Sequence, residues 1–311
     1  MMYNLITNVT RMFLKSPTIS RYSSTFQSHK TMCEKNDIRF PSDDNEPYNL
    51  PITFTELNDA IRTAHNSSTG PDLIHYQILK RLPYSSLQLL TILNKYWLTD
   101  TFSSTWRKAV IIPVPKPGKD SENPNNYRPI ALISCLCKTF ERTINNRLMW
   151  YLEKNKLISP IQNGFRKNRS TIDHLVRFES VLREASIKNL HTVAIFFDVE
   201  KTYDTTWKHG ILQDLQDLHL QGHLPNFIQK ILIDRKFSVR LLNHMSDECD
   251  QETGVPQGSI ISTTLFIIKI NNITKSLPPN VHHFLYVDDF VICYSSSNMN
   301  IIEQKNTTNH L

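Results

Sequence analysis

The stretch at residues 284–292, FLYVDDFVI, constrains the fold of this chain most, because two apolar runs meet there at adjacent carboxylates. The flanking residues favour β-strands, and a short polar break between two such runs is typical of a tight hairpin. The pattern therefore predicts a β-hairpin with Asp288 and Asp289 at its tip. Two carboxylates about 4 Å apart repel by roughly 4 kcal/mol at an effective dielectric constant of 20, so a pair aimed at one point favours a bound cation.

A third carboxylate follows another predicted strand. Residues 193–197, VAIFF, are continuously apolar, which predicts a strand buried on both faces that delivers Asp198 at its end. Oxygen ligands of this kind suit hard divalent ions, and two such ions about 3.5 to 4 Å apart promote in-line transfer at phosphorus. An Asp-Asp pair between strands is, by itself, more often ordinary turn chemistry. The choice between the two interpretations depends on the rest of the chain.

The positive charge of the chain is concentrated in one segment. The net charge is +6, and residues 101–170 contain thirteen Lys and Arg against four Asp and Glu. Such a segment beside a carboxylate centre suits the phosphate backbone of a nucleic acid, although solvated helix faces explain it equally well. The apolar spacing at residues 136–152 predicts an amphipathic helix, and we place Lys138, Arg142 and Arg147 on its outer face.

Cysteines and apolar runs narrow the class of protein. The five cysteines form neither an even set nor a C-x-x-C pair, which argues against a disulfide scaffold and structural zinc and indicates a reducing compartment. No apolar run approaches the roughly 18 residues of a membrane span. Residues 1–33 are basic and rich in Ser and Thr, a composition shared by transit peptides and by unstructured ends. We leave residues 1–40 unassigned, with disorder as one interpretation.

Three polar loops carry candidate contacts to nucleotides. Lysines at residues 116–119, with Arg128 nearby, have the charge and geometry to clamp a triphosphate, whereas a solvated hairpin loop is the alternative. Residues 162–170 are dense in hydrogen-bond donors around one aromatic, as expected where bases stack and backbones are gripped. Residues 254–259 place two glycines before a predicted helix, where backbone N–H groups can meet a nucleotide, although an ordinary turn has the same composition.

The motifs resemble one known family when they are taken in order. FFDVEKTYDTTW at residues 196–207, GVPQGS at 254–259 and FLYVDDF at 284–290 resemble the reverse transcriptase domain of non-long-terminal-repeat retrotransposons, particularly the jockey-like elements of insects. WRKAVIIPVPKPGKD, NNYRPIALISCLCKTFER and QNGFRKNRSTIDHL resemble the fingers and early palm of that family. Each block alone is weak, whereas all of them in the family's order and spacing are specific.

The resemblance implies an α+β fold of the right-hand polymerase type over residues 41–311. Fingers are expected at about residues 50–190 and a partial palm, with helices on one side of its sheet, at about 191–311. Because few residues follow the paired aspartates, we expect a C-terminally truncated domain that lacks the thumb. The same resemblance implies that the endonuclease is absent from this chain.

The implied activity is that of an RNA-directed DNA polymerase. It would use two Mg²⁺ or Mn²⁺ ions to transfer a nucleotide from a dNTP to a primer 3′-hydroxyl. The implied partners are an RNA template, a DNA primer and the dNTP, with no membrane. The family favours the nucleus or cytoplasm, and mitochondrial targeting by residues 1–33 is the alternative.

The resemblance also assigns roles to single residues. The catalytic metal ligands are Asp198, Asp288 and Asp289. The nucleotide contacts are Lys116, Lys119, Arg128, Tyr203, Gln257 and Gly258. Among these, Tyr203 would exclude the ribose 2′-hydroxyl. The template contacts are Gly164, Phe165 and Arg166. The chain departs from the family at Thr202, where Ala is usual.

A second function stays open at this point. The chain is either an active polymerase or an inactive or co-opted nucleic-acid-binding remnant of such an element. The retained aspartates favour activity, whereas the expected lack of a thumb favours the remnant.

Overall fold

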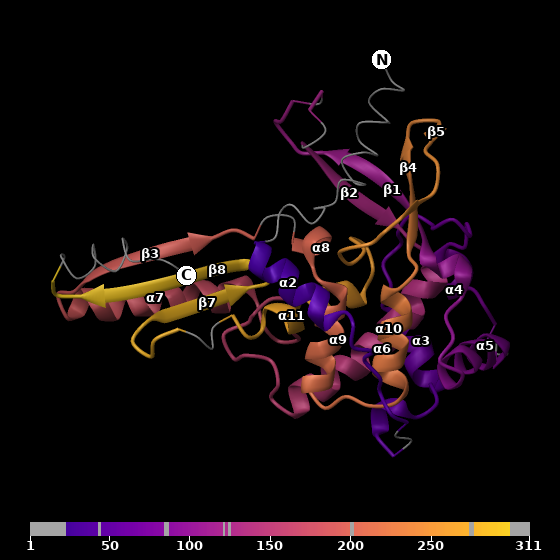
Figure 1. The fold of residues 1–311 in the computed structure, drawn as a ribbon, viewed down its shortest axis with the longest axis horizontal. Helices are drawn as coiled ribbons and strands as arrows, with labels where there is room; N and C mark the ends of the chain where they lie inside the picture. Colours follow the sequence, from indigo (N-terminus) through magenta and orange to yellow (C-terminus); the bar gives the residue numbers. More distant parts are fainter. Residues whose placement is uncertain are drawn as a thin grey trace. The chain divides into compact units, whose positions relative to one another are not determined.

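The computed structural model describes residues 23–42, 45–83, 87–120, 122–123, 126–199, 202–273 and 277–298. By the grouping of their contacts, the residues fall into two compact units. The first comprises Met1–Asn155 and Tyr203–Leu265, and the second comprises Lys156–Thr202 and Phe266–Leu311. Both units contain helices and strands (Figure 1), as expected for the α+β class. Within the described ranges, no helix has the length and apolarity that crossing a membrane requires.

More residues of the first unit lie in helices than in strands. The helices are α2 (Ser24–Cys33), η2 (Pro47–Asn49), α3 (Phe54–Arg62), α4 (Tyr76–Lys80), α5 (Leu87–Leu98), η3 (Ser104–Arg107), α6 (Cys135–Lys154), α9 (Lys208–Asp217) and α10 (His223–Leu232). Two more, α8 (Thr202–Thr205) and α11 (Ile261–Ile270), run across the division between the units. Aromatic rings from α5, α6 and α10 meet in the core, where the centroids of Phe140 and Phe227 lie 4.5 Å apart and Trp97 packs against both.

The segment at residues 23–40 has a defined structure, which corrects the expectation of disorder for this part of the N-terminal region. Helix α2 begins after Ser23, whose side chain caps it by accepting a hydrogen bond from the Phe26 N–H. Ile38 and Phe40 are buried. Burial of these apolar side chains offsets the entropy of ordering the segment. Residues 1–22, which include most of the basic segment considered for targeting, lie outside the described residues.

Helix α6 differs from the expected helix with a basic outer face. Lys138 and Arg147 are each only 8% exposed. Arg147 donates hydrogen bonds of 2.7 Å to both carboxylate oxygens of Glu56, and Arg142 donates to the Ala60 carbonyl at 2.8 Å. The placement predicted from the sequence is therefore wrong, because long basic side chains pack their stems against the protein and satisfy their charge inside it.

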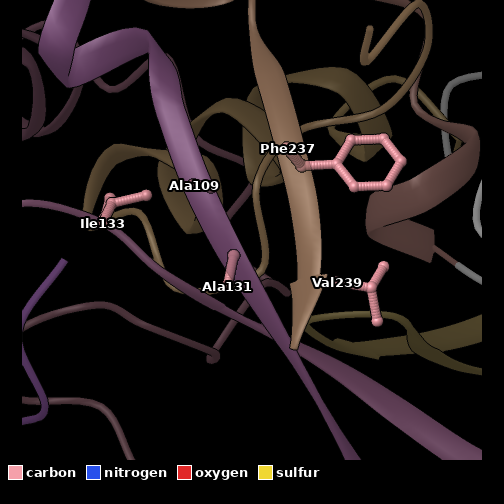
Figure 2. Packing of buried hydrophobic residues seen from close by; sticks show 5 residues of the cluster. All are labelled: Ala109, Ala131, Ile133, Phe237 and Val239. Atoms are coloured by element: carbon pink, nitrogen blue, oxygen red, sulfur yellow. The ribbon is translucent and has the colours of Figure 1, made fainter. Parts of the chain in front are cut away.

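A five-stranded sheet in the first unit carries the predicted triphosphate loop. Its strands are β1 (Lys108–Pro115), β2 (Tyr127–Leu132), β4 (Lys236–Leu241), β5 (His244–Met245) and β6 (Cys249–Asp250). The order is β2-β1-β4-β5, β6 also pairs with β4, and β1 and β2 form an antiparallel hairpin. Figure 2 shows buried hydrophobic residues of this sheet and the one that directly follows β2: Ala109, Ala131, Ile133, Phe237 and Val239.

A three-stranded antiparallel sheet forms the centre of the second unit. Its strands are β3 (His191–Phe197), β7 (His282–Tyr286) and β8 (Asp289–Ser296), in the order β3-β8-β7. Helix α7 (Thr171–Ile187) contacts β3 and β7 (Figure 1). Phe178 and Val181 of this helix pack on Phe284, Val291 and Cys293 of the sheet. The predicted hairpin at residues 284–292 is therefore present, with a helix on one face of its sheet.

Strand β3 is less buried than its sequence predicts. It lies at the edge of the sheet with β8 as its neighbour, and residues 193–195 are half-buried. Phe196 is 70% exposed. The expectation of burial on both faces is wrong, since an unbroken apolar run does not distinguish a central strand from an edge strand.

Candidate active site

The β7–β8 hairpin places the paired aspartates one residue away from the expected tip. Tyr286 pairs with Asp289, which leaves Val287 and Asp288 as the two-residue turn. Asp289 is thus the first residue of β8. Val287 has φ +59°, which is rare for a β-branched residue.

Asp198 comes to the same end of the sheet. The last pair between β3 and β8 is Phe197 with Phe290, so that Asp198 follows directly beside the beginning of β8. Asp198 and Asp289 are exposed, and Asp288 is half-buried. The structure thus brings the three predicted metal ligands to one end of one sheet.

These carboxylates do not form a closed set of ligands. In the described ranges, no three His, Cys, Asp or Glu side chains are close enough together to hold a metal ion. Like charges repel one another, which favours carboxylates that are held apart. Their oxygen donors fit a hard divalent cation. Binding such an ion would require the side chains to turn toward one another, and such a rotamer change is fast for the exposed Asp198 and Asp289.

Thr202 contacts Asp288 directly. Its Oγ1 lies 3.0 Å from Oδ2 of Asp288 and 2.7 Å from the Val199 carbonyl oxygen. The hydroxyl has one proton to donate, so the two acceptors compete for it. No functional role was predicted for Thr202, and the signal that pointed to it was the departure from Ala at this position.

The predicted template block lies partly inside the protein. Gly164 is buried, and a Cβ at this position would lie 2.3 Å from Cγ2 of Val287. Arg166 donates hydrogen bonds from Nη1 to the carbonyls of Ser159 at 2.9 Å and Gln162 at 3.0 Å. Phe165, in contrast, is 56% exposed. The template role of these residues stays a prediction, and among them Phe165 has the exposed ring that stacking requires.

The loop at residues 254–259 is anchored on the segment that contains Tyr203. The Val255 N–H donates to the Tyr203 carbonyl at 2.7 Å. Gln257 Nε2 donates to Oδ1 of Asp204 at 3.2 Å. Two predicted nucleotide contacts, Tyr203 and Gln257, are therefore held together within the first unit. Sequence reasoning assigned no role to Asp204.

The end of the same loop is fixed by a buried carboxylate on α6. Oε2 of Glu141 accepts hydrogen bonds of 2.8 Å from Ser259 Oγ and from the Ile260 N–H. Gly258 has φ +132°, and a Cβ there would lie 2.4 Å from the Ala131 carbonyl oxygen. Gly258 is required by this close approach of the loop to β2, whether or not it also contacts a nucleotide.

The predicted triphosphate contacts share one hairpin. Arg128 pairs with Val114 across β1 and β2. The backbone N–H of Lys116 donates to the Asn126 carbonyl at 2.7 Å. The side chains of Arg128 and Lys119 are exposed, so both cations are accessible to an anion.

Carboxylates gathered at one end of a sheet have the oxygen ligands that hold divalent ions in the two-metal sites of polymerases and nucleases. Residues 114–309 match the family described as reverse transcriptase (RNA-dependent DNA polymerase). The chain belongs to this family, and the family predicted from its motifs is confirmed.

Curated relatives point to the same group of mobile elements. The chain is 32% identical over 259 residues to the probable RNA-directed DNA polymerase from transposon BS of Drosophila melanogaster. It is 30% identical over 255 residues to the RNA-directed DNA polymerase from mobile element jockey of Drosophila funebris, and 27% over 262 residues to the probable enzyme from transposon X-element. Each alignment covers 79% of this chain and 28% of the relative, so the chain spans less than a third of their length.

Proposed function

We propose that this chain catalyses RNA-directed DNA synthesis, in which a nucleotide is transferred from a dNTP to a primer 3′-hydroxyl on an RNA template. One observation carries the proposal: Asp198, Asp288 and Asp289 share one end of one sheet in a chain of the reverse transcriptase family. The relatives named as RNA-directed DNA polymerases support the same reaction.

The three aspartates would hold Mg²⁺ or Mn²⁺. When bound, such ions raise the acidity of the attacking hydroxyl and neutralise charge on the phosphates. The chain itself contributes the carboxylate oxygens of these aspartates as ligands. Register fixes Asp198 beside the first residue of β8, and the turn holds Asp288 between two paired strands.

The first unit would supply the contacts to the nucleotide. Lys119 and Arg128 provide exposed positive charge for the triphosphate, Arg128 with the planar fork that suits phosphate oxygens. Tyr203 and Gln257 would lie against the sugar and base, and the hydrogen bonds that join their segments support a common role. In this proposal the fold is that of polymerase fingers and palm.

The test is incorporation of a single nucleotide by the 311-residue chain, with a labelled DNA primer on an RNA template. We expect Mg²⁺-dependent incorporation and a loss of about a thousandfold or more in Asp198→Asn and Asp288→Asn, because an amide cannot replace the charge that the ion needs. Asp217→Asn, which removes an exposed carboxylate at the end of α9, is the matched control and should stay active. Binding of the primer–template without incorporation would favour the non-enzymatic remnant.

A further inference from the structure

The side-chain amide of Gln162 makes three hydrogen bonds at and near the turn that contains Val287 and Asp288. Gln162 is 1% exposed. Its Oε1 accepts hydrogen bonds from the N–H groups of Val287 at 2.9 Å and Gly164 at 2.8 Å, and its Nε2 donates to the Val287 carbonyl at 3.2 Å. One side chain thus holds both backbone polar groups of Val287.

This turn needs external support because its own residues do not favour it. Val287 occupies the first of two turn positions with φ +59°. In two-residue hairpins, glycine, asparagine or aspartate usually fills a first position with positive φ. A β-branched residue is strained there and persists only where the surroundings fix it. Gln162 supplies that constraint.

Residues 162–164 contact the β7–β8 hairpin directly. Gln162 forms a parallel bridge with Leu285, and the Asn163 N–H donates to the Leu285 carbonyl at 3.1 Å. Gly164 approaches Val287 so closely that any Cβ would overlap it. All of these residues belong to the second unit. Contacts of residues 162–164 with Leu285 and Val287 therefore position the side-chain amide of Gln162.

We propose that Gln162 is a positioning residue for nucleotide transfer. By fixing the backbone of Val287, it sets the direction in which the next residue, Asp288, presents its carboxylate. Gln162 does not contact substrate in this proposal and acts through the turn. The inference rests on the proposed function, because it assumes that Asp288 binds the divalent ion.

A purely structural role is the competing explanation, and the chain contains a matched control for it. Asn94 in the first unit holds Ile52 in the same way: its Oδ1 accepts from the Ile52 N–H at 2.6 Å, and its Nδ2 donates to the Ile52 carbonyl at 2.9 Å. Asn94→Leu and Gln162→Met each remove such a pair of hydrogen bonds, and Gln162→Met also removes the bond to the Gly164 N–H. Both should lower the melting temperature, and only the second should affect the ion.

The first measurement is single-nucleotide incorporation over a range of Mg²⁺ concentrations. We expect Gln162→Met to raise the half-saturating Mg²⁺ concentration about tenfold, as the loss of the two buried hydrogen bonds to Val287 allows. Adding Val287→Gly should reverse at least about threefold of this change, because glycine adopts positive φ without a side-chain penalty. Asn94→Leu should leave the half-saturating concentration unchanged.

A Gln162→Met variant with the wild-type Mg²⁺ dependence would overturn the proposal. So would a shift that Val287→Gly fails to reverse, since the effect would then not pass through the turn.

The second measurement does not require activity and separates this proposal from the proposed function. In Gln162→Met, hydrogen exchange at the Val287 amide should be about tenfold or more faster, since its acceptor is lost, whereas exchange at Val291 in β8 should not change. Unchanged exchange at Val287 would refute the support of the turn even in an active enzyme. In one outcome, exchange at Val287 is faster in Gln162→Met than in wild type while the wild-type chain incorporates no nucleotide. That result would support the role of Gln162 at the turn and refute the proposed function.

Discussion

The Thr202 hydroxyl lies 3.0 Å from Oδ2 of Asp288, at the position where the family that the sequence resembles usually has alanine. A donor on this oxygen competes with a cation for the same lone pairs. Thr202→Ala should therefore lower the half-saturating Mg²⁺ concentration about threefold, in keeping with the roughly 0.5–1.5 kcal/mol of a single hydrogen bond. Thr202→Ser retains the hydroxyl and is the control. A higher Mg²⁺ requirement in Thr202→Ala would show that the hydroxyl assists ion binding.

Gly164 should not tolerate a side chain. In Gly164→Ala the new Cβ would lie 2.3 Å from Cγ2 of Val287 and 2.7 Å from its backbone nitrogen, and the backbone cannot move away cheaply. We expect a loss of about 2 kcal/mol or more in the free energy of unfolding by urea. Gly118→Asn is the control, because Gly118 has φ +69° and no atom within 4 Å of the added Cβ. Equal losses in the two variants would contradict the proposed overlap.

Local patterns in the sequence predicted the hairpin and the strand that precedes Asp198, because both depend on short runs of β-favouring residues bounded by polar ones. The position of the turn was missed by one residue, since it depends on a positive φ that valine rarely adopts. The hydrogen bonds between Gln162 and Val287 join residues 125 positions apart. No periodicity within one chain encodes such a contact.

The positions of the basic side chains were predicted less well from the sequence than the strands and the hairpin. Lys138 and Arg147 were placed on a solvated helix face, yet both are buried. Composition does not distinguish a basic side chain that meets solvent from one that hydrogen-bonds to carbonyls and a carboxylate inside the fold. The resemblance to the family, in contrast, depended on the order of several blocks and was confirmed over residues 114–309.

The buried cations reduce the salt dependence expected for nucleic-acid binding. Of the thirteen Lys and Arg at residues 101–170, six have exposed side chains. They are Lys108, Lys119, Arg128, Lys154, Lys156 and Lys167. Binding of single-stranded RNA should weaken steeply with salt, with a slope of log K against log salt of about 4 at most, since each phosphate contact contributes about 0.7.

Lys119 and Arg128, the exposed cations of the β1–β2 hairpin, should account for part of this salt dependence. The double substitution Lys119→Gln with Arg128→Gln should reduce the slope by about 1.4, which is two contacts at about 0.7 each. Lys154→Gln with Lys156→Gln removes the same charge at the last residue of α6 and just beyond it, and should reduce the slope less. The measurement is a titration of labelled RNA at several salt concentrations. A larger effect of the second pair would place the nucleic acid near the C-terminal end of α6.

The buried Glu141 should make stability depend on pH. Burial raises the pKa of this carboxyl above its usual 4.5, and the positive charge of Arg235 opposes the shift only in part. Because the folded state holds the proton more tightly than the unfolded state, the free energy of unfolding should fall as the pH rises from 4.5 through the folded-state pKa. Glu141→Gln lacks this titration.

The stability advantage of wild type over Glu141→Gln should therefore shrink as the pH rises. Urea unfolding of both proteins between about pH 4.5 and 7.5 measures it, with a change of about 1.4 kcal/mol for each unit by which the pKa is raised. Glu252→Gln, which removes an exposed carboxylate of the same unit, is the control. A difference that is constant or grows with pH would contradict the raised pKa.

Tyr203 should control the choice between deoxyribonucleotides and ribonucleotides. Its ring is half-buried, and its carbonyl accepts the Val255 N–H at 2.7 Å, a backbone contact that a substitution leaves in place. If the ring blocks the 2′-hydroxyl sterically, Tyr203→Ala should reduce the preference for dNTP over the matching ribonucleotide by at least about tenfold. Tyr203→Phe keeps the ring and should keep the preference. The measurement is the ratio of single-nucleotide incorporation rates for the two substrates. An unchanged ratio in an active Tyr203→Ala enzyme would assign the exclusion of ribonucleotides to another residue.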